Sequence, residues 1–321
     1  MSSKLELSTQ KGSGYWGKVK TIQAHLTSPR ELLGIDPRSL VLFRVALALL
    51  VFNDLSTRAI DLTVFYTDQG ALPRAVLLGV KSNPFAISVH LMSGTVFAQR
   101  SLFLLEALCA LGLLLGLWTR WMTFGCWFLT ISLQDRNPLI AMGGADTYLR
   151  LLLFWSLFLP LGKYFSLDAA TESVRENVRR RIFGWGTAAI LLQCTIVYLM
   201  TAALKWRTEL WQQGMAVQQV LSNDIYAKPV AELLLRFPAM VRFLNGAVLG
   251  FETLGPALLF FPFFTGPVRT LAVFGFLFMH LCFYLCLNIY SFQMISAAAM
   301  LLFLPSWFWD KLASRHSRMA A

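Results

Sequence analysis

The stretch Ile190-Leu-Leu-Gln-Cys-Thr-Ile-Val-Tyr-Leu-Met-Thr-Ala-Ala-Leu204 decides the fold of this chain. It belongs to a longer segment, residues 182–204, that contains no Asp, Glu, Lys or Arg. A helix of about 20 apolar residues crosses the hydrocarbon core of a bilayer, where only intrahelical hydrogen bonds satisfy the backbone. The segment therefore predicts a transmembrane helix, which is followed by Lys205 and Trp206.

The rest of the chain has the same character. Of its 321 residues, 56% are hydrophobic and 14% are charged, and the mean hydropathy is +0.58, whereas soluble domains contain about 45–50% apolar and about 25% charged residues. We expect helical spans at residues 38–55, 101–118, 121–134, 147–161, 182–204, 246–263, 268–287 and 290–305. The predicted fold class is all-α: a polytopic integral membrane helical bundle of about eight transmembrane helices.

The economical division of the chain is one membrane domain with short ends. We expect a cytoplasmic N-terminal segment at residues 1–30, a transmembrane domain at residues 31–312 and a cytoplasmic tail at residues 313–321. Two longer segments, residues 56–100 and 206–245, carry prolines between short apolar runs. They predict re-entrant or interfacial structure instead of further domains.

The distribution of basic residues predicts the orientation. With eight spans, sixteen of the 28 Lys and Arg residues fall on the side that holds both chain ends. Because Lys and Arg concentrate in cytoplasmic loops, we expect a multi-pass protein of the cell membrane with both termini in the cytoplasm. The net charge of +11 then reflects topology and contact with membrane lipids. No nucleic-acid partner is expected, because the basic residues are scattered and build no single stripe.

Familiar catalytic and metal-binding signatures are missing from the sequence. All five cysteines fall inside predicted spans, and no Cys and His residues have the spacing of a zinc site. There is also no Walker loop and no GxSxG motif. We therefore expect no metal.

Charged residues inside the predicted spans are more informative, because a charge at mid-membrane costs about 3 kcal/mol or more and tends to persist only with a partner or a role. Arg44 with Glu106 or Glu252 predicts an ion pair between helices. Lys205 leaves two interpretations open. Its amine either extends to the headgroups, as is usual at helix ends, or turns inward, where a desolvated amine can act as a base.

Several motifs resemble those of a known family and occur in the same order. The segment Tyr198-Leu-Met-Thr-Ala-Ala-Leu-Lys205, then Trp211 and Gly214, resembles the lysine-bearing segment of the vitamin K-dependent γ-glutamyl carboxylases and of their bacterial relatives, the HTTM (horizontally transferred transmembrane) domain family. The other matching motifs are Gly34-Ile-Asp-Pro-Arg38 with Leu42-Phe-Arg44, Phe65-Tyr-Thr-Asp68-Gln-Gly70-Ala-Leu-Pro73-Arg74, Arg136-Asn137-Pro138-Leu139 with Gly143-Gly144-Ala-Asp146, Met279-His280 with Phe292, and Pro305-Ser-Trp307 with Lys311-Leu312. The resemblance covers roughly residues 30–315.

The resemblance implies a chemical role for Lys205. In the carboxylases the matching amine deprotonates a reduced vitamin K-type quinone; oxygen adds, and the resulting strong base removes a proton from a glutamate side chain, which then captures carbon dioxide. For this chain the resemblance implies catalytic roles for Lys205 and His280, a reduced quinone as cofactor, and a peptide or protein substrate. It further implies orienting or stabilising roles for Arg136, Asn137 and Asp146, the last standing where the carboxylases have a histidine.

Three functions remain open at this point. The first is a quinol-linked membrane enzyme with Lys205 as general base. The second is a non-catalytic membrane protein that assists the maturation, export or immunity of a peptide or lipoprotein. The third is a transporter, which requires a continuous polar path lined by Arg44, Glu106, Glu252 and His280. The sequence has no internal repeat of the kind that many transporters carry, which disfavours the third function.

Overall fold

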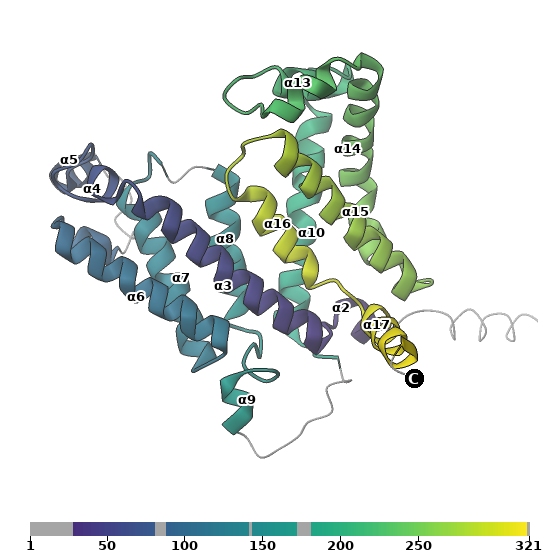
Figure 1. The fold of residues 1–321 in the computed structure, drawn as a ribbon, viewed down its shortest axis with the longest axis horizontal. Helices are drawn as coiled ribbons and strands as arrows, with labels where there is room; N and C mark the ends of the chain where they lie inside the picture. The colour runs from purple at the N-terminus through teal and green to yellow at the C-terminus, as the bar shows by residue number, and fades with distance from the viewer. Residues whose placement is uncertain (1–27, 81–87, 141–142, 172–180, 320–321) are drawn as a thin grey trace, which may run out of the picture.

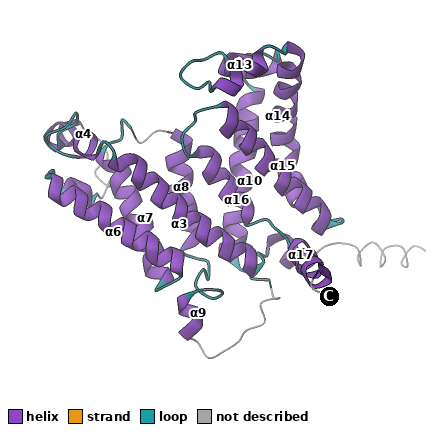
Figure 2. Ribbon diagram, viewed as in Figure 1, coloured by secondary structure: helices purple, strands orange, loops and turns teal. Residues whose placement is uncertain are grey.

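The computed structural model describes residues 28–80, 88–140, 143–171 and 181–319, which form helices joined by turns and loops (Figure 1). The elements are α2 (Pro29–Leu33), α3 (Pro37–Ala59), α4 (Leu62–Tyr66), α5 (Arg74–Val80), η1 (Val89–Leu91), α6 (Val96–Leu115), α7 (Thr119–Arg136), α8 (Gly143–Ser156), α9 (Leu167–Thr171), α10 (Trp185–Trp206), α11 (Glu209–Gln212), α12 (Ala216–Leu221), α13 (Pro229–Leu235), α14 (Pro238–Leu259), α15 (Thr265–Cys286), α16 (Phe292–Leu301) and α17 (Ser306–Met319). No strand occurs in the described ranges (Figure 2), so the all-α prediction is confirmed. Most of the expected N-terminal segment 1–30 lies outside the described residues.

The structure supports fewer membrane spans than the eight predicted. Among the described residues, four helices are long and apolar enough to cross a membrane, α3, α6, α10 and α15, each of 20 to 23 residues. Two bent pairs raise the count to six if each is one broken span: α13 with α14, bent by 110°, and α16 with α17, bent by 81°. Each of the eight predicted segments contains a helix, but α8 has 14 residues and α16 has 10, and α7 carries Arg120, Asp135 and Arg136. The count of eight is not confirmed.

The two proline-bearing segments contain short helices. Residues 56–100 hold α4, α5 and η1, and residues 206–245 hold α11, α12 and α13. In Figure 1 the first group lies at the upper left of the bundle, and α13 lies across the top of α10 and α14. These elements are too short to cross a bilayer and cover one end of the long helices.

Capping residues mark the ends of the long helices. Asp36 accepts a hydrogen bond from the Arg38 backbone N–H at the start of α3, with Pro37 in the first turn, an arrangement that satisfies an otherwise free N–H. Thr95 caps α6 in the same way. Gly116 ends α6 in the left-handed conformation, with φ 69°, which glycine adopts without steric cost. This turn makes α6 and α7 neighbours.

Helix α16 connects two halves of the bundle. On one side α3 packs against α6, and α6 against α7, which in turn contacts α8. On the other side α14 packs between α10 and α15. Helix α16 contacts α3, α8 and α15 and so lies between the two groups, as Figure 1 shows.

A reciprocal contact between glycines and phenylalanines sets the packing of α14 on α15. A Cβ atom added at Gly275 would lie 2.6 Å from the Phe251 ring, and one added at Gly255 would lie 2.8 Å from the Phe276 ring. The two rings are 4.6 Å apart between centroids. Small residues allow membrane helices to approach closely. The close approach places Glu252, next to Phe251, and His280, one turn after Phe276, in the same part of the bundle.

Candidate functional site

Lys205 forms an ion pair with a carboxylate of a neighbouring helix. It lies in the last turn of α10, and its Nζ donates a hydrogen bond of 2.6 Å to Oε2 of Glu252 on α14. The side chain of Lys205 is 17% exposed and that of Glu252 is 4% exposed. The ammonium also lies 4.5 Å from the ring centroid of Trp211, a cation–π contact. Of the two interpretations of Lys205, the structure has the inward one: the amine is paired within the protein.

A second polar pair joins α10 to α15. The Tyr198 hydroxyl and the His280 Nε2 atom are 2.7 Å apart, and both side chains are buried. Phe276 packs on Tyr198, and Phe292 packs edge-on against the imidazole. Within the described part of the chain, His280 Nδ1 is buried and has no hydrogen-bond partner. Because buried polar atoms are nearly always paired, this nitrogen is a candidate contact for a ligand.

Sequence reasoning missed Arg58, which organises a separate polar cluster. Its guanidinium pairs with Asp54 at 2.9 Å and with Asp146 at 2.5 Å, and donates a hydrogen bond to the Tyr66 hydroxyl at 3.0 Å. These contacts join α3, α8 and α4. The spacing of Asp54 and Arg58, four positions apart across the end of the predicted span 38–55, was the available signal.

Arg136 and Asn137 anchor the segment of residues 65–72 that follows α3. Arg136 donates a hydrogen bond to the Leu72 carbonyl at 2.9 Å and lies 3.7 Å from the Asp68 carboxylate. Asn137 donates to the Phe65 carbonyl at 2.9 Å. These contacts do not support the prediction that Arg136, Asn137 and Asp146 act beside Lys205, because each of the three residues forms its hydrogen bonds with other parts of the protein. Lys205, Glu252 and His280 are the predicted residues that the structure brings together.

The predicted pairing of Arg44 with Glu106 or Glu252 is wrong. Arg44 donates hydrogen bonds to the carbonyl oxygens of Leu161, Tyr164 and Phe165, in the turn after α8. Glu106 accepts a hydrogen bond of 2.6 Å from the Thr130 hydroxyl. Three backbone carbonyl oxygens of the turn after α8 accept hydrogen bonds from the guanidinium, which explains why Arg44 needs no acidic partner. Arg44 and Glu106 therefore make contacts separate from the Lys205–Glu252 pair.

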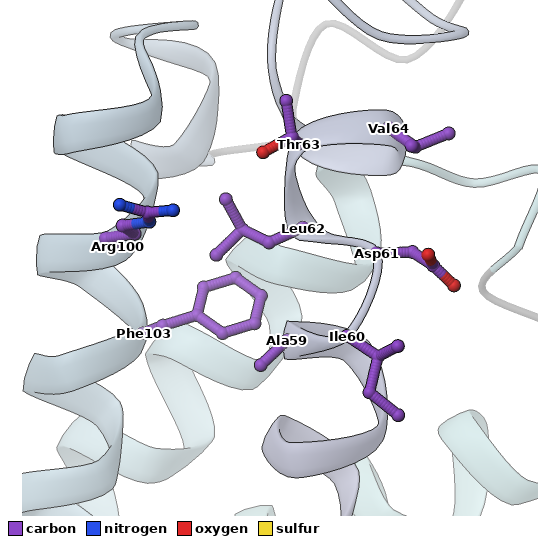
Figure 3. A pocket seen from close by; sticks show the side chains of 8 residues that line it. All are labelled: Ala59, Ile60, Asp61, Leu62, Thr63, Val64, Arg100 and Phe103. Atoms are coloured by element: carbon purple, nitrogen blue, oxygen red, sulfur yellow. The ribbon is translucent and has the colours of Figure 1, made fainter.

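Two cavities open near the loop-covered end of the bundle. The larger, of about 310 Å³, lies between the α3–α4 junction and α6 (Figure 3). The smaller, of about 150 Å³, lies between the end of α7 and the start of α8 and is lined by Asp146 and Arg150 among others. Neither cavity is lined by Lys205 or His280. In the described ranges no group of three His, Cys, Asp or Glu residues has the geometry to hold a metal ion.

Long apolar helices with ion pairs buried between them define the class of this protein: it is a polytopic α-helical membrane protein. The chain belongs to the HTTM family, since the family model described as HTTM domain matches residues 34–307. The suspected family is thereby confirmed. A search of curated proteins and a search of solved structures each returned no match.

Proposed function

We propose that this HTTM-family protein is a membrane enzyme that takes a proton from a lipid-soluble quinol, with Lys205 as the base. The observation that carries the proposal is the inward position of Lys205, which pairs with Glu252 between α10 and α14. A lysine that served only to anchor a helix end would extend to the headgroups. The carboxylase-like segment that ends at Lys205 supports the same assignment.

The Lys205–Glu252 pair has the protonation chemistry that a base requires. In the ion pair the amine is protonated and the carboxylate is not. A proton from the substrate can be taken up by the carboxylate, or by the amine once the proton that the two groups share has moved to Glu252. Such a pair titrates as a unit. Exclusion of bulk water strengthens its interaction with a substrate hydroxyl. The neighbouring Tyr198–His280 pair has a free Nδ1 that suits an orienting contact to a quinol oxygen.

The quinol must reach the amine from the side of Trp211. Glu252 occupies one side of the Lys205 ammonium, and the Trp211 ring lies 4.5 Å away on α11. Helix α11 has only four residues, so a small displacement of it uncovers the amine. Lys205, Glu252 and His280 can form hydrogen bonds with the hydroxyl groups of a quinol, and displacement of Trp211 provides the space for its ring.

Purified protein and an added quinol test the proposal. A reduced, prenylated naphthoquinone is mixed with the protein in detergent under air, and quinone formation is followed by absorbance. Lys205→Arg keeps the positive charge opposite Glu252 but cannot act as a base near neutral pH. Lys205→Met removes both the charge and the base. Because such quinols also oxidise spontaneously in air, each rate is compared with that of a protein-free control. We expect oxidation faster than this control with the wild type only; equal rates in wild type and Lys205→Arg would sink the proposal. A glutamate-containing peptide with labelled bicarbonate tests for a peptide substrate in the same preparation.

A second candidate function is a non-catalytic role in the maturation, export or immunity of a peptide or lipoprotein. It is favoured by the complete ion pair of Lys205, whose amine already has a carboxylate partner. In that case Lys205→Arg preserves the pair and the cellular function, whereas Lys205→Met and Glu252→Gln lower the amount of folded protein in the membrane. Quinol oxidation together with membrane abundance therefore distinguishes the two roles.

We further infer that the protein resides in the cell membrane with both ends in the cytoplasm. The basic residues near α2 and α17, including Arg30, Arg38, Lys311 and Arg315, support this orientation through the positive-inside rule. Single cysteines introduced at Ser28 and at Asp224 into a cysteine-free background are labelled with a membrane-impermeant maleimide in intact cells. We expect labelling of Asp224→Cys alone. Labelling of Ser28→Cys alone would show that the protein has the opposite orientation.

A further inference from the structure

The larger cavity combines an apolar wall with a free cation. It opens where α3 ends and α4 begins, opposite α6, and has a volume of about 310 Å³. Pockets for small ligands begin at about this size. The residues that line it are Ala59, Ile60, Asp61, Leu62, Thr63, Val64, Arg100 and Phe103.

The apolar wall is held by packing behind it. Figure 3 shows the Phe103 ring directed towards Leu62 and Ala59. Behind Phe103 lie the rings of Tyr66, at 5.5 Å between centroids, and His90, at 6.2 Å. Both of those residues are fully buried. The floor of the cavity is therefore fixed by the core of the bundle and does not depend on a bound molecule.

The cation is Arg100, one turn into α6. Its side chain is exposed and, among the residues that the structure describes, it makes no hydrogen bond and no ion pair. In Figure 3 its guanidinium and the Thr63 hydroxyl lie at the same rim of the cavity, whereas the Asp61 carboxylate points to the other side. An unpaired guanidinium beside a hydroxyl is a suitable contact for a phosphate, which it can bind with two parallel hydrogen bonds.

The cavity lies beside the ends of two candidate spans, which is where lipid headgroups meet a membrane helix. Helix α3 is one of the four spans and ends at Ala59, and the span α6 begins at Val96. Around the opening, large apolar side chains face outward: Ile60 is 80% exposed and Phe97 is 82% exposed. Such side chains at the end of a span face acyl chains, not water. A molecule that enters here thus meets a positive charge at headgroup level and hydrocarbon just below it.

We propose that this cavity binds a phospholipid of the surrounding leaflet, with its phosphate on Arg100 and Thr63 and an acyl chain against Leu62 and Phe103. Basic residues between membrane helices bind lipid headgroups in this manner. The site is separate from Lys205, so the proposal does not depend on the quinol chemistry proposed above.

Photo-crosslinking tests the site. The protein in dodecylmaltoside, a detergent without phosphate, is mixed with a diazirine-labelled phosphatidylglycerol and irradiated, and the adducts are mapped to peptides. The competitors are unlabelled phosphatidylglycerol, diacylglycerol, which lacks the phosphate, and glycerol 3-phosphate, which lacks the chains. The variants are Arg100→Gln, Arg100→Lys, Ala59→Leu, which fills the cavity, and the control Arg242→Gln, at an exposed arginine of α14 outside both cavities.

We expect adducts on residues 59–66 and 96–104 that only phosphatidylglycerol competes away. Loss of one charge-assisted phosphate contact should weaken this labelling about tenfold in Arg100→Gln, and Ala59→Leu should reduce it as well. Arg100→Lys keeps the charge but not the two parallel hydrogen bonds, so it should retain more labelling than Arg100→Gln and less than the wild type. Arg242→Gln should label as the wild type does. The proposal is overturned if Arg100→Gln labels normally, if diacylglycerol competes equally, which indicates an apolar groove only, or if glycerol 3-phosphate competes equally, which indicates a site for soluble anions.

Discussion

The Lys205 ammonium and the Glu252 carboxylate, 47 positions apart in the sequence, are joined by a hydrogen bond of 2.6 Å across the α10–α14 interface. Both groups lie on apolar helices, and each is the partner that makes the other acceptable there. The pair ties the end of α10 to the middle of α14. It also places the amine near Tyr198 and His280, so its loss affects both stability and the proposed chemistry.

Breaking the Lys205–Glu252 pair should destabilise the protein more than replacing it. Glu252→Gln leaves a largely buried ammonium without its counterion, which costs on the order of 3 kcal/mol. The double variant Lys205→Met/Glu252→Leu removes both charges and should recover most of that loss. Thermal unfolding in detergent, followed by tryptophan fluorescence, ranks the stabilities of the wild type, Glu252→Gln and the double variant. If the double variant is the least stable of the three, the pair does not act as a coupled unit.

Arg58 should matter more for stability than either of its acidic partners. Arg58→Gln leaves both Asp54 and Asp146 without their guanidinium and should cost about 3 kcal/mol. Asp146→Asn keeps the Asp54 pair and the Tyr66 contact and should cost about 1 kcal/mol. The same unfolding measurement on Arg58→Gln, Asp146→Asn and the double variant gives the coupling free energy between Arg58 and Asp146. Equal losses for Arg58→Gln and Asp146→Asn would mean that the Asp54 and Tyr66 contacts contribute nothing.

The glycines at the α14–α15 contact should not tolerate a methyl group. Gly275→Ala and Gly255→Ala place a Cβ within 2.6 and 2.8 Å of a phenylalanine ring and should each cost about 1–3 kcal/mol through overpacking. Gly250→Ala is the matched control on α14, since nothing lies within 4 Å of its added Cβ. That variant should be neutral or up to about 1 kcal/mol more stable, because alanine favours helix. A neutral Gly275→Ala would show that the two helices are not held at this distance.

His90 should make stability depend on pH in the mildly acidic range. It lies in η1, outside the spans, and burial, together with the nearby Arg136 charge, lowers its pKa to about 4. The unfolded chain binds a proton near the ordinary value of about 6.5 while the folded chain stays neutral. The contribution of His90 to stability is therefore fully present above about pH 6.5 and falls as the pH drops towards 4, at up to about 1.4 kcal/mol per pH unit.

Comparison of the wild type with His90→Asn isolates this effect. The unfolding temperature of each is measured from pH 7 to pH 4.5. The wild type should lose more stability over that range than His90→Asn, whose amide does not titrate. Parallel curves for the two proteins would assign the acid sensitivity to other groups.

The candidate site was only partly predictable from the sequence. Lys205 stood out because a charge after a long uncharged helix is costly in a membrane, and Glu252 and His280 stood out for the same reason. Which of these residues contact one another could not be predicted from the sequence. The predicted Arg44 pairing was wrong because Arg44 bonds to backbone carbonyls, which every residue carries and no sequence pattern marks. Arg58 was overlooked because it lies near the end of a span, where a charge costs little.

The sequence by itself determined the class of protein and its all-helical fold, because apolar content acts locally along the chain. The motifs from Gly34 to Trp307 also sufficed for the family, and its model matches the same range. Only the tertiary structure decided that α14 and α17 bend sharply from their neighbours, that Lys205 meets Glu252, and that Arg58 links α3 to α8. These relationships depend on how each helix is rotated and how closely it packs. Contacts such as Gly275 with Phe251 set that packing between residues that are distant in the sequence.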